Sequence, residues 1–116
     1  MTPPEGIGTM RTYLVTGAAS GIGKATQQLL AERGHRVIGL DLHGTDIDAD
    51  LATAEGRAGL ADAVRAKAPN GLDAILAVAG VALPSSLTVR VNYFGTLATL
   101  ENLRPLLAGS EAPRAV

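Results

Sequence analysis

The stretch YLVTGAASGIGKATQQLLAERGHRVIGLD, residues 13–41, decides the fold class. It begins with a short β-rich segment that ends at Gly17, followed by a segment with apolar residues at helical spacing that ends near Gly34. A second β-type segment then ends at Asp41. The order strand, helix, strand predicts a βαβ unit with two parallel strands.

The rest of the chain continues this alternation. Residues 44–51 predict a weak edge strand, and residues 52–69 predict an Ala-rich helix that ends at a Pro-Asn-Gly turn. Residues 72–80 are almost continuously apolar, which is typical of a parallel strand buried on both faces. Residues 85–107 predict another helix. The sequence therefore predicts an α/β fold with about four parallel strands.

Composition bounds the function. The chain has 116 residues, enough for one domain, of which 47% are hydrophobic and 18% charged. A net charge of −1 gives no electrostatic basis for binding nucleic acid, and the absence of cysteine excludes disulfides and thiol catalysis. Two histidines are too few for a histidine metal site. With no long apolar run and no secretory signal, we expect a cytoplasmic protein that binds neither a membrane nor a metal.

The glycine-rich loop at residues 16–23 joins the first strand to the first helix. Gly17 permits a tight turn, Gly21 lets a phosphate approach the backbone, and Gly23 lets the helix pack closely on the sheet. The N-terminus of the helix would then face a pyrophosphate. Ser20 either donates its hydroxyl to that phosphate or caps the helix, and the two roles are compatible.

An acidic residue follows at the position expected of a dinucleotide site. Asp41 lies 18 positions after Gly23, at the end of the second strand, where a carboxylate can accept hydrogen bonds from both adenosine ribose hydroxyls. A 2′-phosphate would meet like charge there, so we predict NAD rather than NADP. The alternative is a glycine-rich turn with a solvated aspartate. Lys24 and His43 are interpreted first as surface residues, with a phosphate or adenosine contact as the alternative.

The motif TGAASGIG at residues 16–23 resembles the cofactor motif of the short-chain dehydrogenases/reductases. Asp50-Leu51 is similar to the family's pair beside the adenine, Ala79-Gly80 to the end of its Asn-Asn-Ala-Gly motif, and Asn92 to its catalytic-tetrad asparagine. The segments DLATAEGR and VRVNYFGT resemble its bacterial 3α-hydroxysteroid dehydrogenase/carbonyl reductase branch. The resemblance implies a Rossmann-type doubly wound sheet with strand order 3-2-1-4. The cofactor-binding residues it implies, together with the loop and Asp41, are Gly17, Ser20, Gly21, Ile22, Gly23, Asp41, Leu42, Asp50, Leu51, Ala79 and Gly80.

Two departures from the family pattern concern catalysis. Ala77-Val78 replaces the paired asparagines, and neither Tyr13 nor Tyr93 has a lysine four positions on. In the family a Tyr-x-x-x-Lys pair and a serine carry the proton transfer, so Asn92 is the one catalytic-tetrad residue that we identify here. We therefore interpret residues 12–116 as the N-terminal half of an NAD-binding domain, truncated before its fifth strand, and residues 1–11 as a flexible extension.

The resemblance implies an NAD-dependent oxidoreductase acting on an alcohol/ketone pair, such as a steroid-like or other hydrophobic carbonyl compound. Of the residues present, we expect the segment VALPSS at residues 81–86 near the substrate, and its apolar start favours a hydrophobic one. Catalysis by the 116 residues alone is not expected. The alternatives are a non-catalytic dinucleotide-binding module and a gene remnant or interaction partner. An open sheet edge at the fourth strand predicts self-association or pairing with a complementing C-terminal segment.

Overall fold

A computed structural model describes residues 10–81 and 85–116 of the chain. Most of the predicted extension, residues 1–9, therefore lies outside the described residues, as do residues 82–84 of the segment VALPSS that we expected near a substrate. The elements, in chain order, are β1 (Thr12–Thr16), α1 (Gly21–Glu32), β2 (Arg36–Asp41), β3 (Ile47–Asp48), α2 (Ala54–Ala58), α3 (Leu60–Lys67), β4 (Ala74–Ala77), α4 (Ser86–Val89), the π-helix η1 (Arg90–Gly95), α5 (Thr96–Leu107) and β5 (Arg114–Ala115).

One parallel sheet organises the chain, with its strands in the order β3-β2-β1-β4-β5. The predicted α/β class and the order 3-2-1-4 are confirmed. The structure adds a two-residue fifth strand, which pairs Arg114 with Ala74 and Ala115 with Ile75. The sheet edge that we expected to be open at β4 is thus partly covered, and β5 is the edge strand among the described residues.

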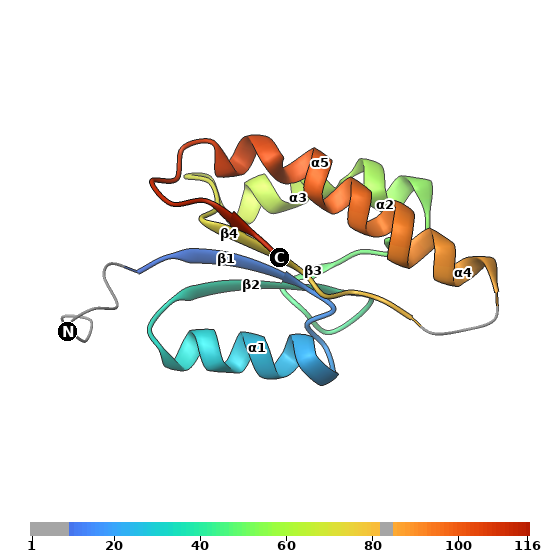
Figure 1. Cartoon of the computed structure of the whole chain (residues 1–116), viewed down its shortest axis with the longest axis horizontal. Helices are drawn as coiled ribbons and strands as arrows, with labels where there is room; N and C mark the ends of the chain where they lie inside the picture. The colour runs from blue at the N-terminus through green and yellow to red at the C-terminus, as the bar shows by residue number, and fades with distance from the viewer. Residues whose placement is uncertain (1–9, 82–84) are drawn as a thin grey trace.

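Helices cover both faces of the sheet, as Figure 1 shows. Helix α1 lies on one face, whereas α2, α3 and α5 lie on the other. The larger core lies on the second face, between the sheet and these helices. Parallel strands joined by helical crossovers are buried, and their side chains are therefore apolar. Its buried members are Leu14, Ile38, Leu40, Ile47, Leu51, Leu60, Val64, Ala68, Leu72, Ile75 and Leu103.

Two predicted helices differ in detail from the structure. The Ala-rich segment forms two short helices, α2 and α3, which meet at Gly59. Thr53 begins α2 by accepting a hydrogen bond on its hydroxyl from the N–H of Gly56, at 3.0 Å. The predicted helix at residues 85–107 is interrupted by the six-residue π-helix η1 between α4 and α5. Its apolar periodicity does not distinguish an i→i+5 turn from an α-helical one.

A polar cluster ties the segment before β5 to the first strand. The carboxylate of Asp73 accepts the N–H of Thr12 at 2.8 Å and the hydroxyl of Ser110 at 2.7 Å. Arg11 donates to the carbonyl oxygens of Asp73 and Ala112. Arg11, which we had counted with the flexible extension, is therefore bound into the fold.

This cluster predicts an acid-sensitive component of stability. The N–H of Thr12, and after it the hydroxyl of Ser110, hold the pKa of Asp73 below its ordinary value. A depressed carboxyl pKa stabilises the fold above the unfolded-state pKa of about 3.9, and this stabilisation is lost as the pH falls through the folded-state pKa. We expect Asp73→Asn to lower the free energy of unfolding by about 1 kcal/mol at pH 7, discounted for solvent screening, and by less at pH 3.

Urea unfolding at both pH values checks this expectation. Asp62→Asn is the control, since the side-chain interaction of Asp62 within the described residues is an exposed ion pair with Arg65, at 3.4 Å. A difference between wild type and Asp73→Asn that is equal at pH 7 and pH 3 would contradict the role of the ionised carboxylate.

Candidate functional site

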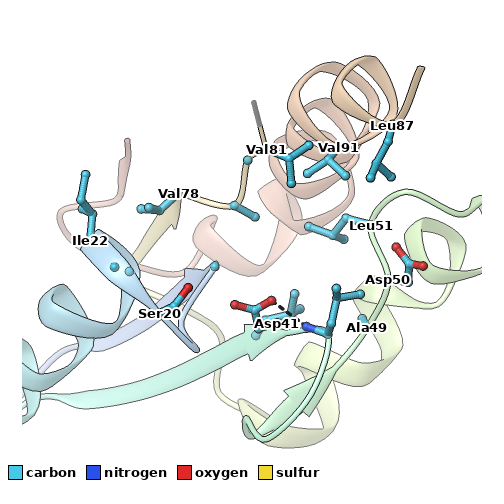
Figure 2. A pocket seen from close by; sticks show the side chains of 17 residues that line it. Ser20, Ile22, Asp41, Ala49, Asp50, Leu51, Val78, Val81, Leu87 and Val91 are labelled. Atoms are coloured by element: carbon cyan, nitrogen blue, oxygen red, sulfur yellow. Dashed lines mark hydrogen bonds between the residues drawn. The ribbon is translucent and has the colours of Figure 1, made fainter. Parts of the chain in front are cut away.

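A cleft of about 610 Å³ opens at the carboxyl ends of β1, β2 and β4. This edge is where parallel α/β sheets bind ligands, because the connecting loops diverge there. All eleven residues that we predicted to contact a cofactor line the cleft. Figure 2 shows Ser20 and Ile22 on the side of the glycine-rich loop, with the carboxylates of Asp41 and Asp50 farther across.

The glycine-rich loop has the backbone geometry that its glycines allow. Gly17 and Gly21 have φ angles of 71° and 56°, which side-chain-bearing residues rarely adopt. A Cβ atom on Gly17 would lie 2.9 Å from the Cα of Ala79. Beside Gly21, no atom of residues 10–81 and 85–116 lies within 4 Å of the Cβ position, so a ligand can reach this part of the backbone.

Gly23 has a different role from the one that we expected. A Cβ atom there would lie 2.0 Å from the carbonyl oxygen of Gly17, so the first turn of α1 packs on the loop that precedes it. Close approach is confirmed, but the partner is the loop backbone rather than the sheet. The glycine therefore sets the position of the helix N-terminus relative to the loop.

Ser20 occupies the N-cap position of α1 without capping it. Its backbone is extended, with φ of −155° and ψ of 168°, and its side chain makes no capping hydrogen bond. Of the two roles considered for this residue, helix capping is thus not observed. The first N–H groups of a helix have no partner within the helix, so those of α1 are available at the cleft.

Asp41 ends β2 and connects three segments around the cleft. Its Oδ2 accepts the N–H of Ala19 at 3.0 Å, and its Oδ1 accepts the N–H of Leu42 at 2.7 Å. Its carbonyl oxygen accepts the N–H of Ala49 at 2.9 Å. The carboxylate that we expected at the adenosine ribose therefore also contacts the glycine-rich loop.

The far wall of the cleft comes from the segment after β3. Leu51 is 5% exposed and belongs to the core, whereas Asp50 accepts the N–H of Ala52 at 2.9 Å through Oδ1. Asp41 and Asp50 are the charged residues among the described residues that line the cleft. The described walls therefore contribute negative but no positive side-chain charge.

The segment after β4 is held from two sides. Ala79 donates its N–H to the buried hydroxyl of Thr16 at 3.0 Å. Asn92 accepts the N–H of Val81 and donates to its carbonyl oxygen, both at 2.8 Å. A Cβ atom on Gly80 would lie 3.1 Å from Oδ1 of Asn92. Asn92 thus orients this segment through its side chain, a contact that its place in the sequence did not reveal.

Several residues considered from the sequence lie away from the cleft. Tyr13 contacts His35 edge-to-face, with ring centroids 5.2 Å apart, and Tyr93 contacts Phe94 in the same way at 5.0 Å. Lys24 and His43 line a separate hollow of about 670 Å³ between α1 and the loop after β2. Neither tyrosine lines either cavity.

The sequence did not identify part of the apolar lining. These residues share an aliphatic side chain and come from β2, from the segments after β3 and β4, and from the α4–η1 helix. The spacing of Leu87 and Val91 by four positions marks one helix face, which would have been the available signal. The lining residues missed are Leu40, Ala49, Val78, Leu87 and Val91, whereas Val81 begins the segment VALPSS that we expected near a substrate.

Across residues 10–81 and 85–116, no three acidic, histidine or cysteine side chains are grouped so that they could hold a metal ion. The helices in the described part of the chain are all too short or too polar to cross a membrane.

The chain is similar in sequence and in fold to known proteins. The chain matches no family model. It is 36% identical over 110 residues to the 3-alpha-hydroxysteroid dehydrogenase/carbonyl reductase of Comamonas testosteroni, covering 92% of this chain and 43% of that protein. It is 32% identical to the coniferyl-alcohol dehydrogenase of Pseudomonas sp. strain HR199, covering 84% of this chain and 41% of the relative. The chain thus spans less than half the length of these two curated relatives.

Among solved structures, the 3-alpha-hydroxysteroid dehydrogenase of Pseudomonas sp. B-0831, solved in complex with NADH, superposes with a TM-score of 0.86. It is 42% identical, and the match covers 90% of this chain and 42% of that one. A metagenomic short-chain oxidoreductase solved with NADP superposes with a TM-score of 0.76 at 22% identity, over 90% of this chain and 59% of that one. The second likeness supports the fold alone.

Proposed function

We propose that this chain, a member of the short-chain dehydrogenase/reductase family by sequence and fold, is the NAD-binding half of an alcohol/ketone oxidoreductase. The observation that carries the proposal is the convergence of the glycine-rich loop, the N-terminus of α1 and Asp41 on one cleft. The 42% identity to a dehydrogenase solved with NADH supports it. Because the charged residues among the described lining are both acidic, a 2′-phosphate is disfavoured, and NAD is preferred over NADP.

The residues present fit a dinucleotide. Two features suit a pyrophosphate at the N-terminus of α1: the accessible backbone at Gly21, and the hydroxyl of Ser20, which makes no capping hydrogen bond to the helix. Asp41 suits the adenosine ribose, and Leu42, Asp50 and Leu51 the adenine. The nicotinamide end would lie toward Ile22, Gly23, Ala79 and Gly80. When bound, NAD supplies the hydride-transfer chemistry.

The chain's own contribution near the reacting groups is orientation. Asn92 holds Val81, and Thr16 holds Ala79, so the segment after β4 is fixed beside the cleft. Neither tyrosine of the sequence lies at the cleft, so proton transfer requires a serine and a Tyr-x-x-x-Lys pair from outside these 116 residues. The aliphatic lining favours a hydrophobic carbonyl substrate, such as a steroid-like compound.

Two surfaces offer contacts for the rest of such an enzyme. The outer edge of β5 is free for a further strand, which a complementing C-terminal segment would supply. The outer side of the continuous α4–η1–α5 helix exposes large apolar side chains, which suit a second copy of the chain. These side chains are Val89, Tyr93, Phe94 and Leu97.

A non-catalytic dinucleotide-binding module is the second candidate. It is favoured by the placement of Tyr13 and Tyr93 away from the cleft, since the binding residues are then assembled without a proton donor. A module of this kind would bind NAD and turn over no alcohol or ketone. A gene remnant would neither bind NAD nor turn over an alcohol or ketone.

Calorimetric titration of the folded chain with NAD, NADP and ADP-ribose tests the proposal. We expect NAD to bind, ADP-ribose to retain most of that affinity, and NADP to bind at least about tenfold more weakly, which is about 1.4 kcal/mol. Absence of NAD binding by a chain that circular dichroism shows to be folded would overturn the proposal. Equal affinity for NAD and NADP would overturn the assigned preference.

A further inference from the structure

Asp41 is engaged with the backbone even without a ligand. Each of its carboxylate oxygens accepts one backbone N–H, from Ala19 at 3.0 Å and from Leu42 at 2.7 Å. A carboxylate offers about four lone-pair sites, so two remain for the hydroxyls of a ribose. Ribose recognition and the backbone contacts therefore do not compete for the same sites.

The bond to Ala19 reaches the tip of the glycine-rich loop. Two hydrogen bonds connect this tip to the end of β2: the N–H of Ala18 donates to the carbonyl oxygen of Leu40 at 3.2 Å, and the N–H of Ala19 donates to Asp41. The second bond is charge-assisted and hence the stronger of the two. Loss of the Asp41 carboxylate would leave the tip with the weaker bond alone.

Asp41 is itself held in place. Its N–H donates to the hydroxyl of Thr45 at 3.0 Å, and that hydroxyl donates to the carbonyl oxygen of Ile47 at 2.8 Å. The loop after β2 thus fixes the residue that holds the glycine-rich loop. Support of this kind reduces the ordering that a ligand must impose on its site, which strengthens binding.

We propose that Asp41 is a positioning residue for the phosphate-binding loop, in addition to its proposed contact with the ribose. This inference rests on the proposed dinucleotide binding. It predicts that changes at Asp41 weaken the binding of ligands that have no ribose hydroxyls. Replacing Asp41 to admit NADP would then loosen the loop that both cofactors need.

Binding of ADP and of 2′,3′-dideoxy-ADP to wild type, Asp41→Ala and Asp41→Asn tests the inference. Dideoxy-ADP lacks both hydroxyls that a carboxylate would recognise, so any effect of Asp41 on its affinity acts through the loop. We expect Asp41→Ala to bind dideoxy-ADP about fivefold or more weakly than wild type does. Asp41→Asn should recover part of this loss, because its amide oxygen can still accept the N–H of Ala19. Asp62→Ala, which removes an exposed charge away from the cleft, is the control and should bind both ligands as wild type does.

Amide hydrogen exchange of the ligand-free chain gives a second readout. We expect the Ala19 N–H to exchange at least about fivefold faster in Asp41→Ala than in wild type, with the core strands unchanged. Wild-type affinity of Asp41→Ala for dideoxy-ADP, or an unchanged Ala19 exchange rate, would overturn the inference and leave Asp41 with the ribose alone. Failure of wild type to bind ADP would instead overturn the proposed function, and the positioning role with it.

Discussion

Gly23→Ala is expected to abolish measurable NAD binding while lowering the free energy of unfolding by about 3 kcal/mol. The added Cβ would lie 2.0 Å from the carbonyl oxygen and 2.6 Å from the carbonyl carbon of Gly17. Both atoms belong to backbone, which cannot rotate away as a flexible side chain can. The N-terminus of α1 must therefore move from the loop, and the proposed pyrophosphate site loses its geometry. Titration with NAD and urea unfolding measure the two effects.

Two other glycines separate this steric effect from the general cost of adding a methyl group. Gly109 has nothing within 4 Å of its Cβ position, so Gly109→Ala should change neither stability nor binding. Gly34 also has open space, but its φ is 85°, so Gly34→Ala should cost about 1–2 kcal/mol through backbone strain alone. NAD binding by Gly23→Ala at wild-type strength would contradict the role given to the loop.

The local part of the site could be predicted from the sequence because its signals are local. The glycine spacing at residues 17–23 and the acid at the end of β2 lie within one βαβ unit. At each of these positions, the residue type follows from the backbone conformation or the charge that the position needs. The parallel sheet and its order could be predicted for a related reason, since alternating strands and helices allow few connections.

Contacts between distant segments could not be predicted in the same way. The N–H of Ala79 donates to the hydroxyl of Thr16, which lies 63 positions earlier in the sequence. Gly17 also packs against the backbone of Ala79. The clamp of Asn92 on Val81 depends on how the helix beginning at α4 returns over β4. These arrangements follow from packing rather than from any one residue's preference. Interruptions at Gly59 and at η1 were missed because apolar periodicity continues through both.

The second large effect concerns the core rather than the cleft. Ile75→Ala is expected to lower the free energy of unfolding by about 3–4 kcal/mol, within the range found for buried isoleucine and leucine. Ile75 is 0% exposed and lies in β4, paired with Leu14 of β1 and Ala115 of β5. Its side chain belongs to the aliphatic cluster between the sheet and the larger helical layer. The cluster is aliphatic and fully packed around Ile75, so removing three carbon atoms leaves a cavity that these neighbours fill only in part.

Ile22→Ala is the matched control for this change. It removes the same atoms from a side chain that is 77% exposed, so the unfolding of the ligand-free protein should change by less than about 0.5 kcal/mol. Thermal unfolding should place the midpoint of Ile75→Ala about 12–16 °C below that of wild type, at roughly 4 °C per kcal/mol, the value between those for smaller and larger domains. Similar losses from both variants would contradict the assignment of Ile75 to the core.

NAD should separate the core effect from the cleft effect in the same experiment. A ligand that binds only the folded state at one hundred times its Kd adds about 2.7 kcal/mol to stability. Ile75 does not line the cleft, so Ile75→Ala should gain the same increment from NAD as wild type, starting from a lower value. Gly23→Ala should have a lower free energy of unfolding than wild type and should gain no stability from NAD, because the substitution lies where the phosphates are proposed to bind. If Ile75→Ala also lost the increment, β4 would couple the core to the cleft, and the segment held by Thr16 and Asn92 would be the place to trace that coupling.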